Sequence, residues 1–322
     1  MVGKYTIEVY NNKLHYDFEV KRNITIIQGN SATGKTTLIN LVAAHERLGK
    51  NSGITLNCEK KCVVLPVGRW QEFMRETKDS IIFVEENMPF IRTTEFAECV
   101  NYSDNYFVIV FRDSLPQLAY SIEEIYGIKQ DRDSQKYVNT KRVYESMYHI
   151  YNLDKLSGVK PDVVVTEDAN SGYEFFDSAF NCECVASEGK SKVYNVMSMH
   201  ASQDKTVLGI VDGAAFGADM QKMMTSLSGK EDRCCLYAPE SFEYLILKSG
   251  IVDFPQKKLE KTFDYADSSK YESWEQYYTD QLGEVTRNTN HQYSKAKLNP
   301  FYTTEGNIRR VKRTIEGIDF GD

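Results

Sequence analysis

The sequence feature that most constrains the fold is the run Gly29-Asn30-Ser31-Ala32-Thr33-Gly34-Lys35-Thr36, which fits G-x-x-x-x-G-K-[ST] at every fixed position. The run Ile24 to Ile27 before it is apolar on both faces, as in a strand buried inside a sheet. From Thr36 onward, apolar residues recur at helical spacing. A strand, a glycine-bearing loop and a helix in this order are typical of a phosphate-binding loop.

The residue types in this loop suit the binding of a triphosphate. Gly29 and Gly34 allow successive backbone N–H groups to point at phosphate oxygens, and the following helix adds the positive end of its dipole. Lys35 would reach the outer phosphates, and the Thr36 hydroxyl would bind Mg²⁺. We therefore expect the segment from Gly29 to Thr37 to bind a nucleotide. The alternative is a glycine-bearing turn without a ligand.

Two later strands end in charged residues that would complete a hydrolytic site. The buried run Ile81 to Val84 is followed by Glu85, which we assign to the metal, and by Glu86, which we assign to activation of water. The alternative is a strand end capped by solvated acids. The next buried run ends at Arg112, which we interpret as a sensor of the γ-phosphate.

Strands alternate with helices along the chain, which predicts an α/β fold with largely parallel sheets. An N-terminal hairpin is expected over residues 5–20, and a helical connector over residues 121–157. A second series of strands and helices begins near Pro161. We predict a first domain at 1–155, a smaller α/β domain at 156–255 and a helical, basic tail at 256–322.

The second domain has acids after its predicted strands. Glu167 follows one strand, Asp212 another, and Glu240 and Glu243 follow the third. Acids at the carboxyl ends of neighbouring parallel strands converge on one crevice. Because converging carboxylates repel one another, we expect Mg²⁺ or Mn²⁺ there, with Glu167, Asp212 and Glu240 as ligands and phosphodiester cleavage as the chemistry. Strand-end acids that merely face solvent are the alternative.

The first 115 residues resemble the ATP-binding cassette and RecF-like branch of P-loop ATPases. The resemblance rests on the hairpin, the Walker A motif at residues 29–36, the Walker B strand before Glu85 and the sensor strand before Arg112. It implies ATP as the nucleotide. The chain departs from that branch because it has no room for a long helical arm and no LSGGQ signature before Glu85.

Residues 160–250 resemble a Toprim domain, which has a glutamate after its first strand and an Asp-x-Asp pair after a later one. Glu167 and Asp212 match, but Ala214 occupies the second Asp position, for which Asp168 and Asp219 are candidate substitutes. An ATPase followed by a Toprim domain is similar to the overcoming-lysogenisation-defect nucleases and to ATPase–Toprim pairs of bacterial phage defence. That resemblance implies an ATP-controlled, metal-dependent nuclease or a sensor built on the same frame. The second hypothesis is an ATP-dependent oligomeric scaffold or sensor with an inactive Toprim-like domain that holds a partner protein.

Charge and composition limit the partners and the location. The net charge is −7, but residues 287–313 carry seven basic residues against one acid. This stretch fits a nucleic-acid contact, a solvated face or a patch that docks on the acidic body. The seven cysteines are an odd number, which we read as reduced thiols. We found no long apolar run and no leader, so we expect a cytoplasmic protein without membrane contact.

Overall fold

The structure is a computed structural model that describes residues 1–29, 34–131, 143–153 and 156–321. The chain divides into two compact units. Unit 1 comprises Met1–Tyr151 and Thr262–Ser273, and unit 2 comprises Asn152–Lys261 and Trp274–Asp322. Of the segment 256–322, in which we expected a separate tail, residues 262–273 therefore lie in unit 1 and the rest in unit 2.

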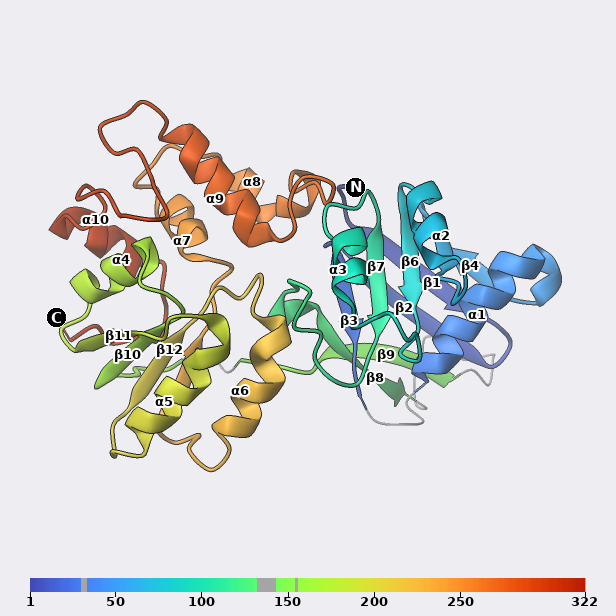
Figure 1. Cartoon of the computed structure of the whole chain (residues 1–322), viewed down its shortest axis with the longest axis horizontal. Helices are drawn as coiled ribbons and strands as arrows, with labels where there is room; N and C mark the ends of the chain where they lie inside the picture. Colours follow the sequence, from blue (N-terminus) through green and yellow to red (C-terminus); the bar gives the residue numbers. More distant parts are fainter. Residues whose placement is uncertain (30–33, 132–142, 154–155, 322) are drawn as a thin grey trace. The chain divides into compact units, whose positions relative to one another are not determined.

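Unit 1 is built on a nine-stranded sheet with the order β4-β1-β2-β9-β8-β3-β7-β6-β5 (Figure 1). Its strands are β1 (Tyr5–Tyr10), β2 (Leu14–Val20), β3 (Ile24–Ile27), β4 (Thr55–Asn57), β5 (Lys61–Val64), β6 (Ser80–Val84), β7 (Tyr106–Val110), β8 (Ile125–Asp131) and β9 (Val143–His149). Strands β3, β7, β6 and β5 run parallel to one another. Strands β1 and β2 pair in antiparallel register, which confirms the predicted hairpin.

The predicted helical connector at 121–157 is wrong. Its described residues contain a single short 3-10 turn, η2 (Ile122–Glu124), and the strands β8 and β9. These two strands pair with each other, and β8 also pairs with β3 while β9 pairs with β2. The segment is rich in Tyr, Val and Ile, which favour strands, and pairing inside the sheet outweighs the helix-forming charged residues between them.

Unit 1 also contains three helices, α1 (Lys35–Leu48), α2 (Trp70–Glu76) and α3 (Thr94–Val100), and the 3-10 turns η1 (Gly49–Ser52) and η6 (Thr262–Asp264). Helix α1 packs on the sheet through its apolar face, where Leu38 and Val42 are fully buried in the same hydrophobic core as Val108 of β7. Burial of each such side chain stabilises the fold by roughly 1.5–3 kcal/mol. This packing fixes the amino end of α1 above the sheet.

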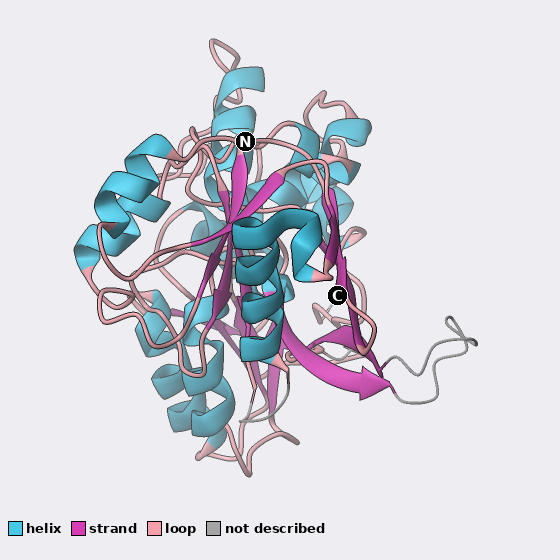
Figure 2. Ribbon diagram, turned by 90° about the vertical axis from the view of Figure 1, so that its right-hand side faces the viewer, coloured by secondary structure: helices cyan, strands magenta, loops and turns pink. Residues whose placement is uncertain are grey.

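Unit 2 has a four-stranded sheet in which every strand runs parallel to its neighbour. The order is β11 (Glu183–Ala186), β10 (Val163–Thr166), β12 (Val207–Ile210) and β13 (Cys234–Tyr237). Figure 2 shows helices flanking strands, as the α/β class requires. The helices of unit 2 are α4 (Ser171–Ala179), α5 (Val193–Ala201), α6 (Met220–Ser226), α7 (Phe242–Ser249), α8 (Gln256–Glu260), α9 (Trp274–Val285) and α10 (Glu305–Lys312). The α/β class predicted from the sequence is therefore confirmed.

The aromatic residues near the start of α9 form a packing face. Trp274, Tyr277 and Tyr278 are buried, and Tyr271, which lies ahead of the helix, is buried as well. Tyr278 packs against Tyr244 of α7, with ring centroids 5.1 Å apart. These buried rings therefore stabilise the packing of α9 and of the segment that precedes it.

Candidate functional site

In unit 1, the strands that precede the charged residues are neighbours in the sheet. Strand β7 lies between β3 and β6, and all three run parallel. Their carboxyl ends therefore meet at one edge of the sheet (Figure 1). Gly29, Glu86 and Arg112 lie at this edge, because each follows the end of one of these strands by two residues. This is the edge at which ligands bind in open parallel sheets.

The described ends of the glycine loop have backbone conformations that favour glycine. Gly29 has φ of 129° and Gly34 has φ of 94°, a region that other residues rarely adopt. Helix α1 begins directly after Gly34, and the Lys35 ammonium donates to the Gly29 carbonyl across the loop at 2.6 Å. The predicted loop residues Asn30, Ser31, Ala32 and Thr33 lie outside the described residues.

Lys35 is a buried cation at this edge, with a side chain only 5% exposed. Burial lowers the pKa of Lys35 below its ordinary value, the nearby Glu86 carboxylate opposes this shift, and Arg112 adds to it. A desolvated ammonium at the start of a helix attracts an anion strongly, because little water screens its charge. Thr36 is exposed on the first turn of α1, and Thr37 is half-buried.

Glu86 and Arg112 form an ion pair, with Arg112 Nη2 2.9 Å from Glu86 Oε1 and Nε 3.1 Å from Oε2. The two-point contact fixes the planes of both groups. Gln28 supports this arrangement, because its side-chain amide donates to the carbonyl oxygens of Arg112 and Asp113. Glu85 is half-buried directly after β6. The structure thus brings Lys35, Glu86 and Arg112 together.

The residues at this edge fit a nucleoside triphosphate. Phosphate oxygens require cations and N–H donors, and the edge supplies Lys35, Arg112 and the amino end of α1. The Thr36 hydroxyl and the carboxylates of Glu85 and Glu86 are oxygen donors of the kind that Mg²⁺ prefers.

In unit 2, Glu167 and Asp212 lie side by side at the carboxyl ends of the paired strands β10 and β12. The Asp212 amide donates to Glu167 Oε1 at 2.8 Å, and Asp212 Oδ1 accepts from the Phe242 amide at 3.1 Å. Both acids line a small pocket of about 40 Å³, together with Asp168, Glu243 and other residues. The sequence predicted that Glu167 and Asp212 lie close together, and the hydrogen bond between them agrees with this prediction.

Both carboxyl groups are harder to ionise than usual. Burial raises the pKa of Glu167 to about 7, opposed by the Lys190 ammonium and by the hydrogen bond from Asp212. Burial also raises the pKa of Asp212 well above its ordinary value, and the negative charges of Glu275 and Glu167 raise it further. The charge of this pocket therefore changes near neutral pH.

The cations beside this pair are lysines, and they are held by a glutamate that the sequence did not single out. Glu275 in the first turn of α9 lies 2.7 Å from Lys295 and 3.4 Å from Lys190. Although burial would raise the pKa of Glu275, the two lysines lower it overall. Glu275 is 108 residues from Glu167 in the chain, so only the fold could reveal it.

Glu240, which we predicted as a metal ligand, does not line the pocket. Helix α7 begins at Phe242 rather than at Pro239, because the Ser241 hydroxyl caps it by accepting from the Tyr244 amide. Glu243 in the first turn lines the pocket instead. Its Oε1 accepts from the Tyr293 hydroxyl at 2.6 Å, and Tyr293 also bonds to the Ser171 hydroxyl at 2.7 Å.

The acids of unit 2 do not form a ready metal site. Among the residues that the structure describes, no group of three or more His, Cys, Asp or Glu is placed to hold a metal ion. The second Asp position of the expected pair is Ala214, which is buried. Asp168 accepts from Asn170 through both carboxylate oxygens, and Asp219 precedes α6 outside the pocket. The residues present therefore do not fit the three-acid metal set of the resemblance.

No protein-family model matches the chain, and no curated protein is significantly similar to it. Within the described ranges, no helix combines the length and the apolar character needed to cross a bilayer.

Proposed function

We propose that unit 1 binds and hydrolyses ATP with Mg²⁺, and that the bound nucleotide controls the state of unit 2. The observation behind this proposal is the buried Lys35 ammonium, which shares one sheet edge with the Glu86–Arg112 ion pair. The Lys35 ammonium donates to the Gly29 carbonyl and lies near the Glu86 carboxylate, and a phosphate bound at the same edge would add a further charge-assisted contact to it. The preference for ATP rests on the resemblance to P-loop ATPases.

Each residue at the edge has a distinct role in this proposal. Lys35 binds the outer phosphates, whereas Thr36 and Glu85 would hold Mg²⁺, which neutralises phosphate charge when bound. Glu86 accepts a proton from, or orients, the attacking water. Arg112 holds Glu86 in place and is available to contact the terminal phosphate, so its two-point pairing would change with the nucleotide state.

For unit 2 we propose a conformational output, namely an ATP-dependent scaffold or sensor that acts on a partner protein or through a homo-oligomer. Ala214 in the second acid position and the lysine-held Glu275 favour this output. Nucleic-acid cleavage is the second candidate, favoured by the contact between Glu167 and Asp212. In that case the basic segment 287–313 is the candidate contact surface. By resemblance, either output would suit bacterial phage defence.

Calorimetry with Mg·ATP tests the nucleotide site. We expect Lys35→Ala to weaken binding at least about 100-fold, because it removes the charge-assisted contacts to the phosphates. Lys50→Ala is the control, since Lys50 is an exposed lysine beyond the end of α1. Equal affinities of the wild type and Lys35→Ala would remove the basis of the proposal.

A second experiment separates the two outputs of unit 2. Wild type, Glu167→Ala and Asp212→Ala would be incubated with DNA, RNA and tRNA in Mg²⁺ or Mn²⁺, and their assembly state would be followed with and without ATP. The scaffold proposal expects no cleavage by any of them, and an ATP-dependent assembly that Lys35→Ala abolishes. Cleavage by the wild type that is lost in both acid variants would instead establish a nuclease.

A further inference from the structure

The segment 262–273, which we call the return segment, leaves unit 2 after α8 and re-enters it at α9, but docks on unit 1. The Gly3 amide donates to the carbonyl of Phe263 at 2.6 Å. The Asn23 side-chain amide donates to the carbonyls of Tyr271 and Glu272, at 2.7 and 3.2 Å. Asn23 is buried, so these two bonds are shielded from water and hold the end of the return segment firmly.

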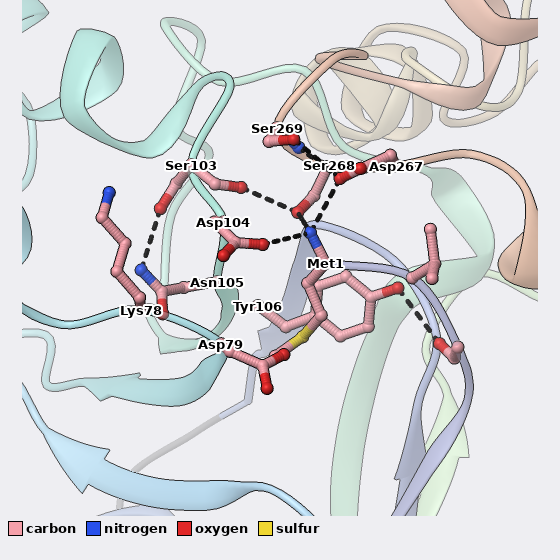
Figure 3. Close-up of polar contacts among 12 residues, drawn as sticks. Met1, Lys78, Asp79, Ser103, Asp104, Asn105, Tyr106, Asp267, Ser268 and Ser269 are labelled. Atoms are coloured by element: carbon pink, nitrogen blue, oxygen red, sulfur yellow. Dashed lines mark hydrogen bonds and ion pairs between the residues drawn. The ribbon is translucent and has the colours of Figure 1, made fainter.

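The docking contacts fall at the amino ends of the two strands that lead to the nucleotide site. Asn23 directly precedes β3, and its carbonyl accepts from the Phe107 amide of β7. The Ser268 hydroxyl donates to the Ser103 carbonyl shortly before β7, and the Met1 ammonium lies between Asp104 and Asp267 (Figure 3). The other ends of β3 and β7 continue into the glycine loop and Arg112.

On its far side, the return segment leads directly into the acid site of unit 2. Glu275 follows Glu272, the last residue that Asn23 holds, by only three residues, which span at most about 11 Å of chain. Glu275 contacts Lys190 and Lys295, and Lys295 lines the pocket that contains Glu167 and Asp212. A displacement at Asn23 therefore has a short covalent path to the residue that positions both lysines.

We propose that the return segment couples the two sites: nucleotide binding shifts β3 and β7, Asn23 passes the shift to the return segment, and Glu275 changes its hold on Lys190 and Lys295. Asn23 is a positioning residue in this scheme, since it contacts neither site. The inference rests on the proposed function, because it requires a nucleotide at the edge that carries Lys35. Under this proposal, nucleotide binding in unit 1 regulates the pocket of unit 2 that contains Glu167 and Asp212.

The chain contains a natural reporter for this coupling. Its two tryptophans are Trp70 in α2 and Trp274, which lies between Glu272 and Glu275 and is buried. In Trp70→Phe, the fluorescence of Trp274 alone would be recorded while Mg²⁺ and a non-hydrolysable ATP analogue are added. We expect its emission to change on binding. We expect Asn23→Ala in the same background to bind the nucleotide but to reduce the change about threefold or more.

Controls distinguish a failed coupling from a failed nucleotide site. Asn57→Ala removes an exposed amide of unit 1 that contacts Glu8, and it should keep the full Trp274 response. Calorimetry on each variant reports binding separately from fluorescence. No binding to any variant would contradict the proposed function, whereas normal binding with a silent Trp274, or with a full response in Asn23→Ala, would overturn the coupling alone.

A measurement on the wild-type protein tests the same coupling and does not depend on whether a variant folds. Hydrogen exchange of the wild-type amides of 262–275 would be compared with and without the ATP analogue. Coupling predicts altered protection in this segment and around Lys190, in addition to the change around Lys35. Protection that changes only around Lys35 would also overturn the proposal.

Discussion

The two units present acids at the same place, the carboxyl edge of a parallel sheet, but compensate their charge differently. In unit 1, Glu86 faces Arg112 and the buried Lys35, whose pKa is lowered. In unit 2, Glu167 and Asp212 face each other and their pKa values are raised, while the nearby lysines are held by Glu275. The first edge is prepared to receive an anion, whereas the second can relieve repulsion by taking up protons.

The largest expected effect tests the proposed role of the first edge in ATP hydrolysis. Glu86→Gln should reduce ATP hydrolysis about 100-fold or more, because an amide cannot accept the proton of the attacking water. Binding of Mg·ATP should change only slightly, since Lys35 remains. Phosphate release and calorimetry measure the two quantities. A variant that hydrolyses ATP at the wild-type rate would exclude Glu86 as the base.

The next effect tests the protonated state of the second edge. The pKa of Glu167 is raised from 4.5 to about 7 in the folded protein. Between these two pH values the folded protein holds a proton that the unfolded chain has released, so the free energy of unfolding falls as the pH rises from 4.5 to about 7. We expect the wild type to lose about 2 kcal/mol between about pH 5 and about pH 8, measured by urea denaturation. Asp212 contributes with the same sign.

Glu167→Gln should lose clearly less stability than the wild type over that range. Glu188→Gln is the matched control, because Glu188 is an exposed glutamate on the loop after β11. It should keep the wild-type loss. If the wild type, Glu167→Gln and Glu188→Gln lost the same free energy of unfolding over this pH range, Glu167 would be ionised in the folded protein. The acids of unit 2 would then not differ from those of unit 1 in their protonation.

A smaller effect tests the buried hydroxyl that supports the second edge. Tyr293→Phe removes the hydrogen bond to Glu243 and leaves that buried carboxyl poorly solvated. We expect a loss of about 1.5 kcal/mol in the free energy of unfolding. Tyr102→Phe, which alters an exposed ring of unit 1, should be nearly neutral. Equal stability of both variants would mean that Glu243 finds another donor.

The smallest effect compares one helix cap in each unit. Ser241 caps α7 and is fully buried, whereas Thr93 caps α3 and is exposed. Replacement of Ser241 by Ala should cost about 1 kcal/mol, and the same change at Thr93 should cost less, because water can more easily take the place of the exposed Thr93 hydroxyl than of the buried Ser241 hydroxyl. Thermal unfolding of both variants measures the difference, and the reverse ranking would contradict it.

Local patterns predicted much of this fold. The strand β3, the helix α1 and the strands β6 and β7 follow from short apolar runs and from the glycines between them. The pairing of β8 and β9 inside the sheet could not be read from residues 121–157, because their strand identity depends on β2 and β3 far away in the chain. Glu240 was chosen over Glu243 because the sequence does not show that Ser241 starts the helix.

By itself, the sequence determined where strands, the glycine loop and strand-end acids occur, since these depend on neighbouring residues and on backbone freedom at Gly29 and Gly34. Only the tertiary structure decided that β7 separates β3 from β6, that Glu275 holds two lysines, and that residues 262–273 return to unit 1. The physical reason is distance along the chain. Such contacts join residues from 20 to about 250 positions apart, and they form only when the burial of apolar surface brings those residues together.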